Sequence, residues 1–148
     1  MGLRKSEATT GPFPGAHDDD FGRHSSEFFI EQLKAMRPSV IVTMGKYVPT
    51  LIAPLSPQLE TWRGSQGFRQ IDDSGPVVHR CRFAGVSDFE VTVVALVHPS
   101  MRHASVRCRY YRKEWRGNEA ERAMIEAATS GFPHLAATAD KASEETEA

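Results

Sequence analysis

The sequence predicts an α/β protein built around a mostly parallel sheet. Two β-branched, apolar runs carry this prediction: residues 39–44 (SVIVTM) and 89–97 (FEVTVVALV). Each is followed at once by turn residues, Gly45 in the first case and His98-Pro99-Ser100 in the second. The succession of helix, strand, glycine and helix around the first run is typical of a parallel α/β sheet. The 148 residues, 40% hydrophobic and 25% charged, have the size and composition of one globular domain.

The first half of the chain predicts a lead-in, a helix and a strand. Residues 1–24 are rich in Gly, Pro and Asp, which indicates an irregular segment. A helix is expected to begin at Ser25 or Ser26, because its apolar residues then recur at helical spacing: Phe28, Phe29, Leu33 and Met36. Pro38 ends this helix, and residues 39–44 show the pattern of a strand buried on both faces. Residues 46–53 predict a short helix.

The second half predicts two strands and a final helix. Residues 55–70 are expected to be mostly loop, and residues 77–83 and 89–97 to be strands with Gly85 in the turn between them. Pro99 forbids continued pairing in the middle of a sheet, so the second strand ends before it. Residues 118–128 predict a helix, with these residues on its apolar side: Ala120, Met124, Ile125 and Ala128. We therefore expect a domain over residues 25–130, after the lead-in 1–24 and before a disordered acidic tail, 131–148.

The net charge of −1 conceals a basic centre. Residues 76–117 hold eight basic and three acidic side chains, a net charge of +5, whereas residues 118–148 carry −5. Such a basic segment is typical of a surface that binds a polyanion such as nucleic acid. Clustered arginines are equally often exposed to solvent without binding a partner. No apolar run is long enough for a membrane span, and a soluble, cytoplasmic protein is expected. Two cysteines, Cys81 and Cys108, are too few for a disulfide framework or a four-thiolate site, so no metal or other cofactor is expected.

The candidate site lies where the two predicted strands end. In open α/β sheets, ligands bind beyond the carboxyl ends of the strands, here Gly45-Lys46 and His98-Pro99-Ser100. This segment combines a histidine, a turn stiffened by proline, a hydroxyl group and, further on, arginines. Residues of these types are suited to binding a phosphate backbone. Further along, aromatic residues interleave with basic ones: Arg109, Tyr110, Tyr111, Arg112, Lys113, Trp115 and Arg116.

Two segments resemble the uracil-DNA glycosylase superfamily. Residues 29–46 (FIEQLKAMRPSVIVTMGK) resemble its helix and "P-x-V-I-V-x-x-G" strand, and residues 94–100 (VALVHPS), followed by Arg102, resemble its H-P-S loop. The resemblance covers roughly residues 25–128. It implies a three-layer α/β/α sandwich that hydrolyses the N-glycosidic bond of a flipped, damaged base such as uracil, in base-excision DNA repair.

The resemblance also implies roles for individual residues. His98 matches the histidine that contacts the carbonyl oxygen of the base and stabilises negative charge as the bond breaks. Gly45 and Lys46 would form the floor of the base pocket. Pro99 and Ser100 match the part of the loop that pinches the DNA backbone, and Met101 and Arg102 occupy the wedge. The residues expected to contact DNA are Pro99, Ser100, Met101, Arg102, His103, Arg107 and Arg109.

The chain departs from the family at its N-terminal side. The family's glycine-rich loop, whose acidic residue or asparagine positions the hydrolytic water, precedes the first matched helix and is not found. Asp18, Asp19 and Asp20 follow no strand. The fold is thus expected to be shortened at the N-terminus, with an exposed sheet edge that promotes self-association and leaves these residues uncovered: Val40, Val42, Val93 and Leu96. A non-catalytic DNA-binding module and a truncated gene product are the alternatives to an active enzyme.

Overall fold

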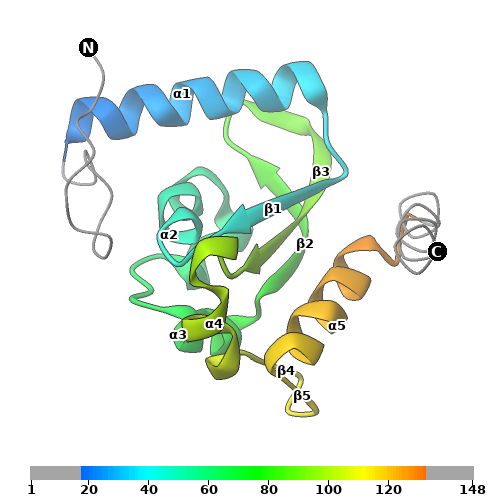
Figure 1. The fold of residues 1–148 in the computed structure, drawn as a ribbon. Helices are drawn as coiled ribbons and strands as arrows, with labels where there is room; N and C mark the ends of the chain where they lie inside the picture. The colour runs from blue at the N-terminus through cyan, green and yellow to red at the C-terminus, as the bar shows by residue number, and fades with distance from the viewer. Residues whose placement is uncertain (1–17, 133–148) are drawn as a thin grey trace, which may run out of the picture.

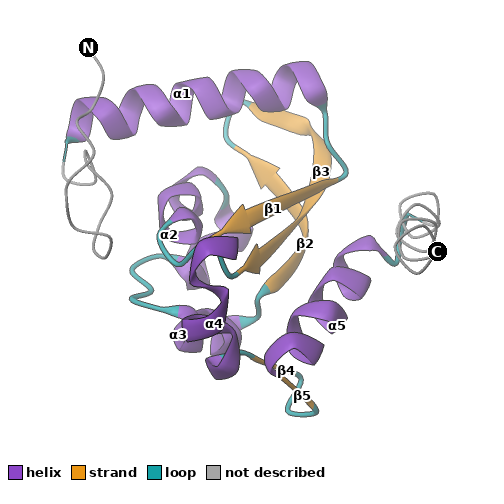
Figure 2. Cartoon of the chain, viewed as in Figure 1, coloured by secondary structure: helices purple, strands orange, loops and turns teal. Residues whose placement is uncertain are grey.

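The computed structural model describes residues 18–132 and has a mixed α/β fold (Figures 1 and 2). The helices are α1 (Asp19–Met36), α2 (Val48–Ile52), α3 (Phe68–Ser74), α4 (Arg102–Ser105) and α5 (Gly117–Thr129). The strands are β1 (Val40–Met44), β2 (Val77–Phe83), β3 (Val86–Leu96), β4 (Tyr110–Tyr111) and β5 (Trp115–Arg116). Short 3₁₀ helices occupy Ala53–Leu55, Pro57–Trp62, Pro99–Met101 and Val106–Cys108.

The main sheet has the strand order β1-β3-β2. β1 runs parallel to β3, with Val40 opposite Thr92 and Met44 opposite Leu96. β2 runs antiparallel to β3, so the prediction of a mostly parallel sheet is wrong for this strand. The reason is the short turn at Gly85 (φ +78°), which joins β2 directly to β3 and leaves no room for the crossover that a parallel pair needs.

The core lies on both faces of this sheet. On one face, α1, α2, α3 and the Pro57–Trp62 segment cover a large cluster, which includes Leu33, Leu59, Trp62, Ile71, Phe83, Val91 and Val93. On the other face, α5 covers a smaller cluster of Val94, Tyr111, Ala120, Met124 and Ala128. The neighbours Val93 and Val94 belong to different clusters because successive side chains of a strand alternate between faces. The prediction that β3 is buried on both faces is confirmed.

β1 is less covered than the sequence predicts. It is the edge strand, and α5 packs mainly on β2 and β3, with Val40 as the residue of β1 that packs against the α5 cluster. As a result, Val42 and Met44 are 46% and 48% exposed. The expected exposed edge is thus confirmed at Val42, but it is wrong for Val93, which is fully buried because β3 is the central strand.

α1 begins earlier than the sequence predicts. Asp18 is its N-cap: its carboxylate accepts hydrogen bonds from the backbone N–H groups of Asp20 (3.0 Å) and Phe21 (3.1 Å). Ser26 lies inside the helix, where its hydroxyl donates to the carbonyl of Gly22. Residues 19–24, expected to be irregular, are therefore helical. Residues 1–17 and the acidic tail from residue 133 onwards lie outside the described residues.

The expectation of a mostly irregular segment over residues 55–70 is also wrong in part. The 3₁₀ helix Pro57–Trp62 and the start of α3 fall within it. Leu59 and Trp62 are fully buried, and the Trp62 indole N–H donates to the carbonyl of Gly75 (2.9 Å). These contacts with distant residues fix a segment whose own pattern is weak.

Candidate functional site

The carboxyl ends of β1 and β3 lie side by side. The backbone N–H of Gly45 donates to the carbonyl of Leu96 (2.9 Å), and a Cβ atom added at Gly45 would lie 3.6 Å from Cβ of His98. Gly45 has a φ of +93°, a conformation that side chains rarely allow. The structure thus brings together the two turns that the sequence nominates.

His98 is exposed, and its ring is oriented by Ser100. Its Nδ1 lies 3.2 Å from the backbone N of Ser100 and 2.7 Å from the Ser100 hydroxyl oxygen. The backbone N–H of Ser100 can only donate a hydrogen bond, so Nδ1 of His98 is the acceptor. The neutral ring therefore carries its proton on Nε2. His98 therefore offers an Nε2–H donor to a ligand.

A groove of about 750 Å³ opens beside this turn, between the end of the sheet and α5. Its apolar walls come from Met44, Leu96, Pro99 and Ile125, and its polar walls from Arg102, Asn118, Glu119, Arg122 and Glu126. A volume of this size is typical of sites for small ligands.

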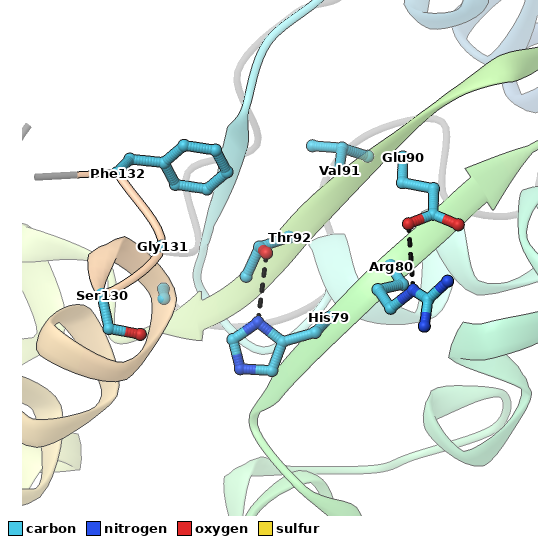
Figure 3. Close-up of a pocket in the computed structure, with 9 residues that line it drawn as sticks. His79, Arg80, Glu90, Val91, Thr92, Ser130, Gly131 and Phe132 are labelled. Carbon is cyan, nitrogen blue, oxygen red and sulfur yellow. Dashed lines mark hydrogen bonds and ion pairs between the residues drawn. The ribbon is translucent and has the colours of Figure 1, made fainter.

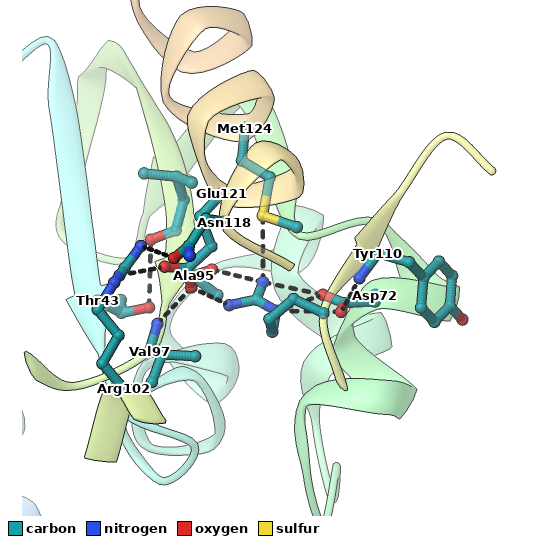
Figure 4. Close-up of polar contacts among 11 residues, drawn as sticks. Thr43, Asp72, Ala95, Val97, Arg102, Tyr110, Asn118, Glu121 and Met124 are labelled. Carbon is teal, nitrogen blue, oxygen red and sulfur yellow. Dashed lines mark hydrogen bonds and ion pairs between the residues drawn. The ribbon is translucent and has the colours of Figure 1, made fainter. Parts of the chain in front are cut away.

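Glu121, on α5, lines the groove and also takes part in a buried network of hydrogen bonds and ion pairs (Figure 4). Only 2% of this residue is exposed. Its Oε1 accepts from the backbone N–H of Val97 (2.7 Å) and from Nη1 of Arg109 (2.8 Å), and its Oε2 accepts from Nη1 of Arg102 (2.7 Å). The carboxylate therefore fixes the backbone directly before His98.

Arg109 is completely buried, so its prediction as a DNA contact is wrong. Its Nε and Nη2 donate to the carboxylate of Asp72 at 2.9–3.1 Å, and its Nη2 also donates to the carbonyl of Ala95 (2.8 Å). The guanidinium group lies over the ring of Phe68, 4.4 Å from its centroid. A buried charge needs such partners, and the two carboxylates of Asp72 and Glu121 supply them.

Burial raises the pKa of Asp72 to about 6, although the hydrogen bonds and charge of Arg109 oppose this rise. Asp72 also accepts from the backbone N–H of Tyr110 (3.1 Å). Neither Asp72 nor Glu121 is predicted as a site residue by the motifs of the sequence. A signal exists for Glu121, which occupies the apolar stripe of α5 together with Met124 and Ala128.

The other predicted site residues differ in whether their side chains already have partners on the protein. Arg102 is held by Glu121 and by Oδ1 of Asn118 (2.7 Å), so its charge is already compensated. The ammonium of Lys46 lies 5.0 Å from the ring centroid of its neighbour Tyr47. The remaining predicted contacts are exposed: Pro99, Ser100, Met101, His103 and Arg107.

The basic centre of the sequence is only partly available at the surface. Four of its eight basic residues are ion-paired: Arg80 and Arg82 with Glu90, Arg102 with Glu121, and Arg109 with Asp72 and Glu121. The other four are exposed and have no ion pair within residues 18–132: Arg107, Arg112, Lys113 and Arg116. The free positive charge is therefore concentrated between residues 107 and 116.

The three aspartates at the start of α1 do not join the site. Asp18 caps the helix, and Asp20 pairs with Arg23 (3.1 Å). Figure 1 places this end of α1 well away from the tip of β1. These carboxylates stabilise the helix instead, through the cap and the favourable position of negative charge at its N-terminus.

A second pocket, of about 280 Å³, lies between the β2–β3 hairpin and the end of α5 (Figure 3). Its wall includes His79, whose Nδ1 lies 3.2 Å from the hydroxyl of Thr92, and the ion pair of Arg80 with Glu90. None of the site residues that the sequence predicts lines this pocket.

Across the described part of the chain, no group of three or more His, Cys, Asp or Glu side chains is arranged to hold a metal ion. In residues 18–132 no helix has both the length and the apolar character needed to cross a membrane. Comparison of the chain with protein-family models, curated proteins and solved structures finds no match.

Proposed function

We propose that the protein binds a nucleobase flipped out of DNA at the carboxyl ends of β1 and β3, and that it hydrolyses the N-glycosidic bond of a damaged base such as uracil. The observation that carries the proposal is the position of His98. It stands beside Gly45 at the adjacent ends of two parallel strands, with Nδ1 occupied by Ser100 and Nε2–H available.

This arrangement suits the electrostatic demand of the reaction. When the glycosidic bond breaks, negative charge develops on a carbonyl oxygen of the leaving base. An oriented Nε2–H of His98 can donate to that oxygen, and removal of one such donor typically lowers a rate by about 10²–10³. The Ser100 hydroxyl, 2.7 Å from Nδ1, acts on this reading as an orienting group rather than as a phosphate ligand.

The DNA backbone would be held by the exposed residues that follow His98. Pro99, Met101, His103 and Arg107 are open to solvent, and Arg107 has no ion pair within the described residues. Arg102 serves to fix the turn, because its guanidinium is bonded to Glu121 and Asn118. The contacts with DNA are thus expected to depend more on Arg107 than on Arg102.

The placement of helices agrees with the proposal. The core clusters under α1 and under α5 lie on opposite faces of the sheet, which supports a three-layer α/β/α arrangement like that of the uracil-DNA glycosylase superfamily. Among residues 18–132, one edge of β1 pairs with no strand and so leaves a position for one more. In that superfamily, such a strand would carry the loop that positions the hydrolytic water.

A non-catalytic DNA-binding module is the second candidate. It is favoured by Glu121, the buried carboxylate next to the H-P-S turn, because its charge is already paired with Arg102 and Arg109, which makes it a poor base for activating water. Glu119 and Glu126 also line the groove and are the carboxylates there that form no ion pair within residues 18–132.

Release of uracil from a single-stranded oligonucleotide distinguishes the two candidates. Under single-turnover conditions, with protein in excess, the proposed glycosylase releases uracil slowly, and Glu119→Gln and Glu126→Gln test whether either of these groove carboxylates contributes to that rate. Binding of the same oligonucleotide without any release of uracil would instead establish the non-catalytic module.

A further inference from the structure

We infer that the β4–β5 hairpin, residues 110–116, is a binding surface for single-stranded nucleic acid. The inference rests on the proposed function only for the class of partner, DNA. It assigns a separate surface, which would hold the strand beyond the base bound at His98. Figure 1 shows this hairpin projecting at the end of the molecule opposite α1.

The charge of the hairpin fits a phosphate backbone. Arg112, Lys113 and Arg116 are exposed and have no ion pair within residues 18–132, and Glu114 is the one acidic residue among them. Arg107 adds a further exposed positive charge just before the hairpin. Cations that form no ion pair within residues 18–132 are available to replace the counterions of phosphates.

The aromatic residues of the hairpin favour unpaired bases. Trp115 is 42% exposed, although it is one of the largest apolar side chains. The guanidinium of Arg112 lies 5.0 Å from the ring centroid of Tyr111, and that of Arg116 lies 5.1 Å from the ring centroid of Tyr110. Tyr111 is buried in the core and Tyr110 is half-buried, so Trp115 is the exposed ring of the hairpin that can stack on an unpaired base, next to the cations of Arg112 and Arg116. In a duplex the faces of the bases are already stacked, so Trp115 would find no partner there.

The turn of the hairpin holds cations where glycine or asparagine is favoured. Arg112 and Lys113 have φ values of 50° and 64°, in the left-handed region. Non-glycine residues in such conformations are concentrated at functional sites, where side-chain chemistry outweighs backbone strain. Both side chains are exposed, so the tip of the hairpin presents two neighbouring cations to solvent.

The base of the hairpin is firmly anchored. The backbone N–H of Tyr110 donates to Asp72 (3.1 Å), and the N–H of Gly117 donates to the carbonyl of Arg109 (2.9 Å). The buried side chain of Arg109 in turn bonds to Glu121, which also holds Val97 beside the H-P-S turn. One buried network therefore positions both surfaces, and a surface held in place loses less conformational entropy when a strand binds.

The test measures binding to a fluorescent oligothymidine that contains no uracil, and to a duplex of the same length. We expect Trp115→Ala to weaken binding to the single strand at least about fivefold, the lower limit for loss of one stacked base, and to leave duplex binding almost unchanged. Trp115→Phe, which keeps a ring, restores most of the affinity. The double variant Arg112→Glu, Lys113→Glu weakens binding to the single strand at least tenfold, or about 1.4 kcal/mol.

The matched control is Arg23→Glu, Lys34→Glu, which reverses the same number of exposed charges on α1. We expect it to bind oligothymidine like the wild type. If Trp115→Ala has no effect, or if the α1 control loses as much affinity as the hairpin variant, the inference is overturned. The two proposals can fail separately. If the hairpin variants lose affinity for the single strand but the wild type releases no uracil, only the glycosylase proposal is refuted. If the wild type releases uracil and the hairpin variants bind the single strand normally, only the hairpin inference is refuted.

Discussion

The backbone N–H of Val97 donates to Oε1 of Glu121 over 2.7 Å, so a carboxylate on α5 holds the residue directly before His98. The same oxygen accepts from Arg109, which bonds to Asp72 on α3. The position of the H-P-S turn is thus set by a buried ionic network as well as by the sheet.

Glu121→Ala should lower the free energy of unfolding by about 3–5 kcal/mol, because it leaves the buried Arg109 with half of its compensating charge. Urea denaturation measures this loss. Glu126→Ala, an exposed glutamate on the same helix, is the matched control and should leave the midpoint unchanged. Equal effects of the two substitutions would show that Glu121 has no special role in the fold.

Asp72 should make the protein relatively more stable as the pH falls from 7 to 5. Its pKa is raised from 3.8 to about 6 in the folded protein, so the folded state takes up a proton in this range that the unfolded state does not. Linkage then adds about 1 kcal/mol to the free energy of unfolding at pH 5 relative to pH 7, and this gain is lost as the pH rises through 6. Asp72→Asn should abolish this contribution, which is measured as the difference between the two proteins in urea denaturation at both pH values. A difference that shrinks on acidification would mean that the ion pair with Arg109 outweighs the effect of burial.

Arg107→Glu should weaken DNA binding without destabilising the fold, since Arg107 is exposed and has no ion pair within the described residues. If Arg107 contacts one phosphate of a single strand, its loss reduces the slope of log affinity against log salt concentration by about 0.7. Arg109→Met, in contrast, removes no surface charge, so it should lower stability but leave the slope of the salt dependence unchanged. A salt titration identical to that of the wild type would exclude Arg107 from the interface.

The free edge of β1 should cause self-association. Strand β1 contains no charged residue, its outer backbone groups have no partner strand within the described residues, and Val42 is 46% exposed. We expect sedimentation velocity to show a larger species as the protein concentration rises, and Val42→Lys to suppress it. Met36→Lys places the same charge at an exposed apolar position on α1 and should not. A wild type that stays monomeric at all concentrations would contradict this expectation.

The two thiols should differ sharply in reactivity. Cys81 is fully buried, and burial raises its pKa to about 11, whereas Cys108 is exposed. Because the thiolate is the reactive form, a thiol reagent at neutral pH should label one cysteine rapidly and the other only on unfolding. Mass spectrometry of the labelled peptides identifies them, and rapid labelling of Cys81 would contradict the packing of β2.

The sequence predicts the strands and the proximity of their carboxyl ends better than it predicts the charged interior. β1 and β3 are evident because their patterns are local, and a glycine or a proline marks the end of each. The general rule for parallel strands then places Gly45 beside His98. Local pattern also suffices for β2, but not for its direction, which depends on the short turn at Gly85.

The burial of Arg109 could not be read from the sequence. Its partners Asp72 and Glu121 lie 37 and 12 residues away, and an arginine in a basic segment looks like a surface residue until those carboxylates are placed. The start of α1 was missed for a different reason. Asp18 is followed by a first helical turn, residues 19–22, in which Phe21 is the one large apolar residue, so no apolar periodicity marks the start of the helix.

The most direct test of the account is single-turnover release of uracil from a single-stranded oligonucleotide by the wild type and by His98→Ala. Slow release by the wild type should fall by about 10²–10³ in the variant, because one oriented donor to the leaving base is lost. Asp18→Ala, Asp19→Ala and Asp20→Ala serve as controls and should leave the rate unchanged, since these carboxylates lie at the start of α1. Release by His98→Ala at the wild-type rate would contradict the assignment of the site.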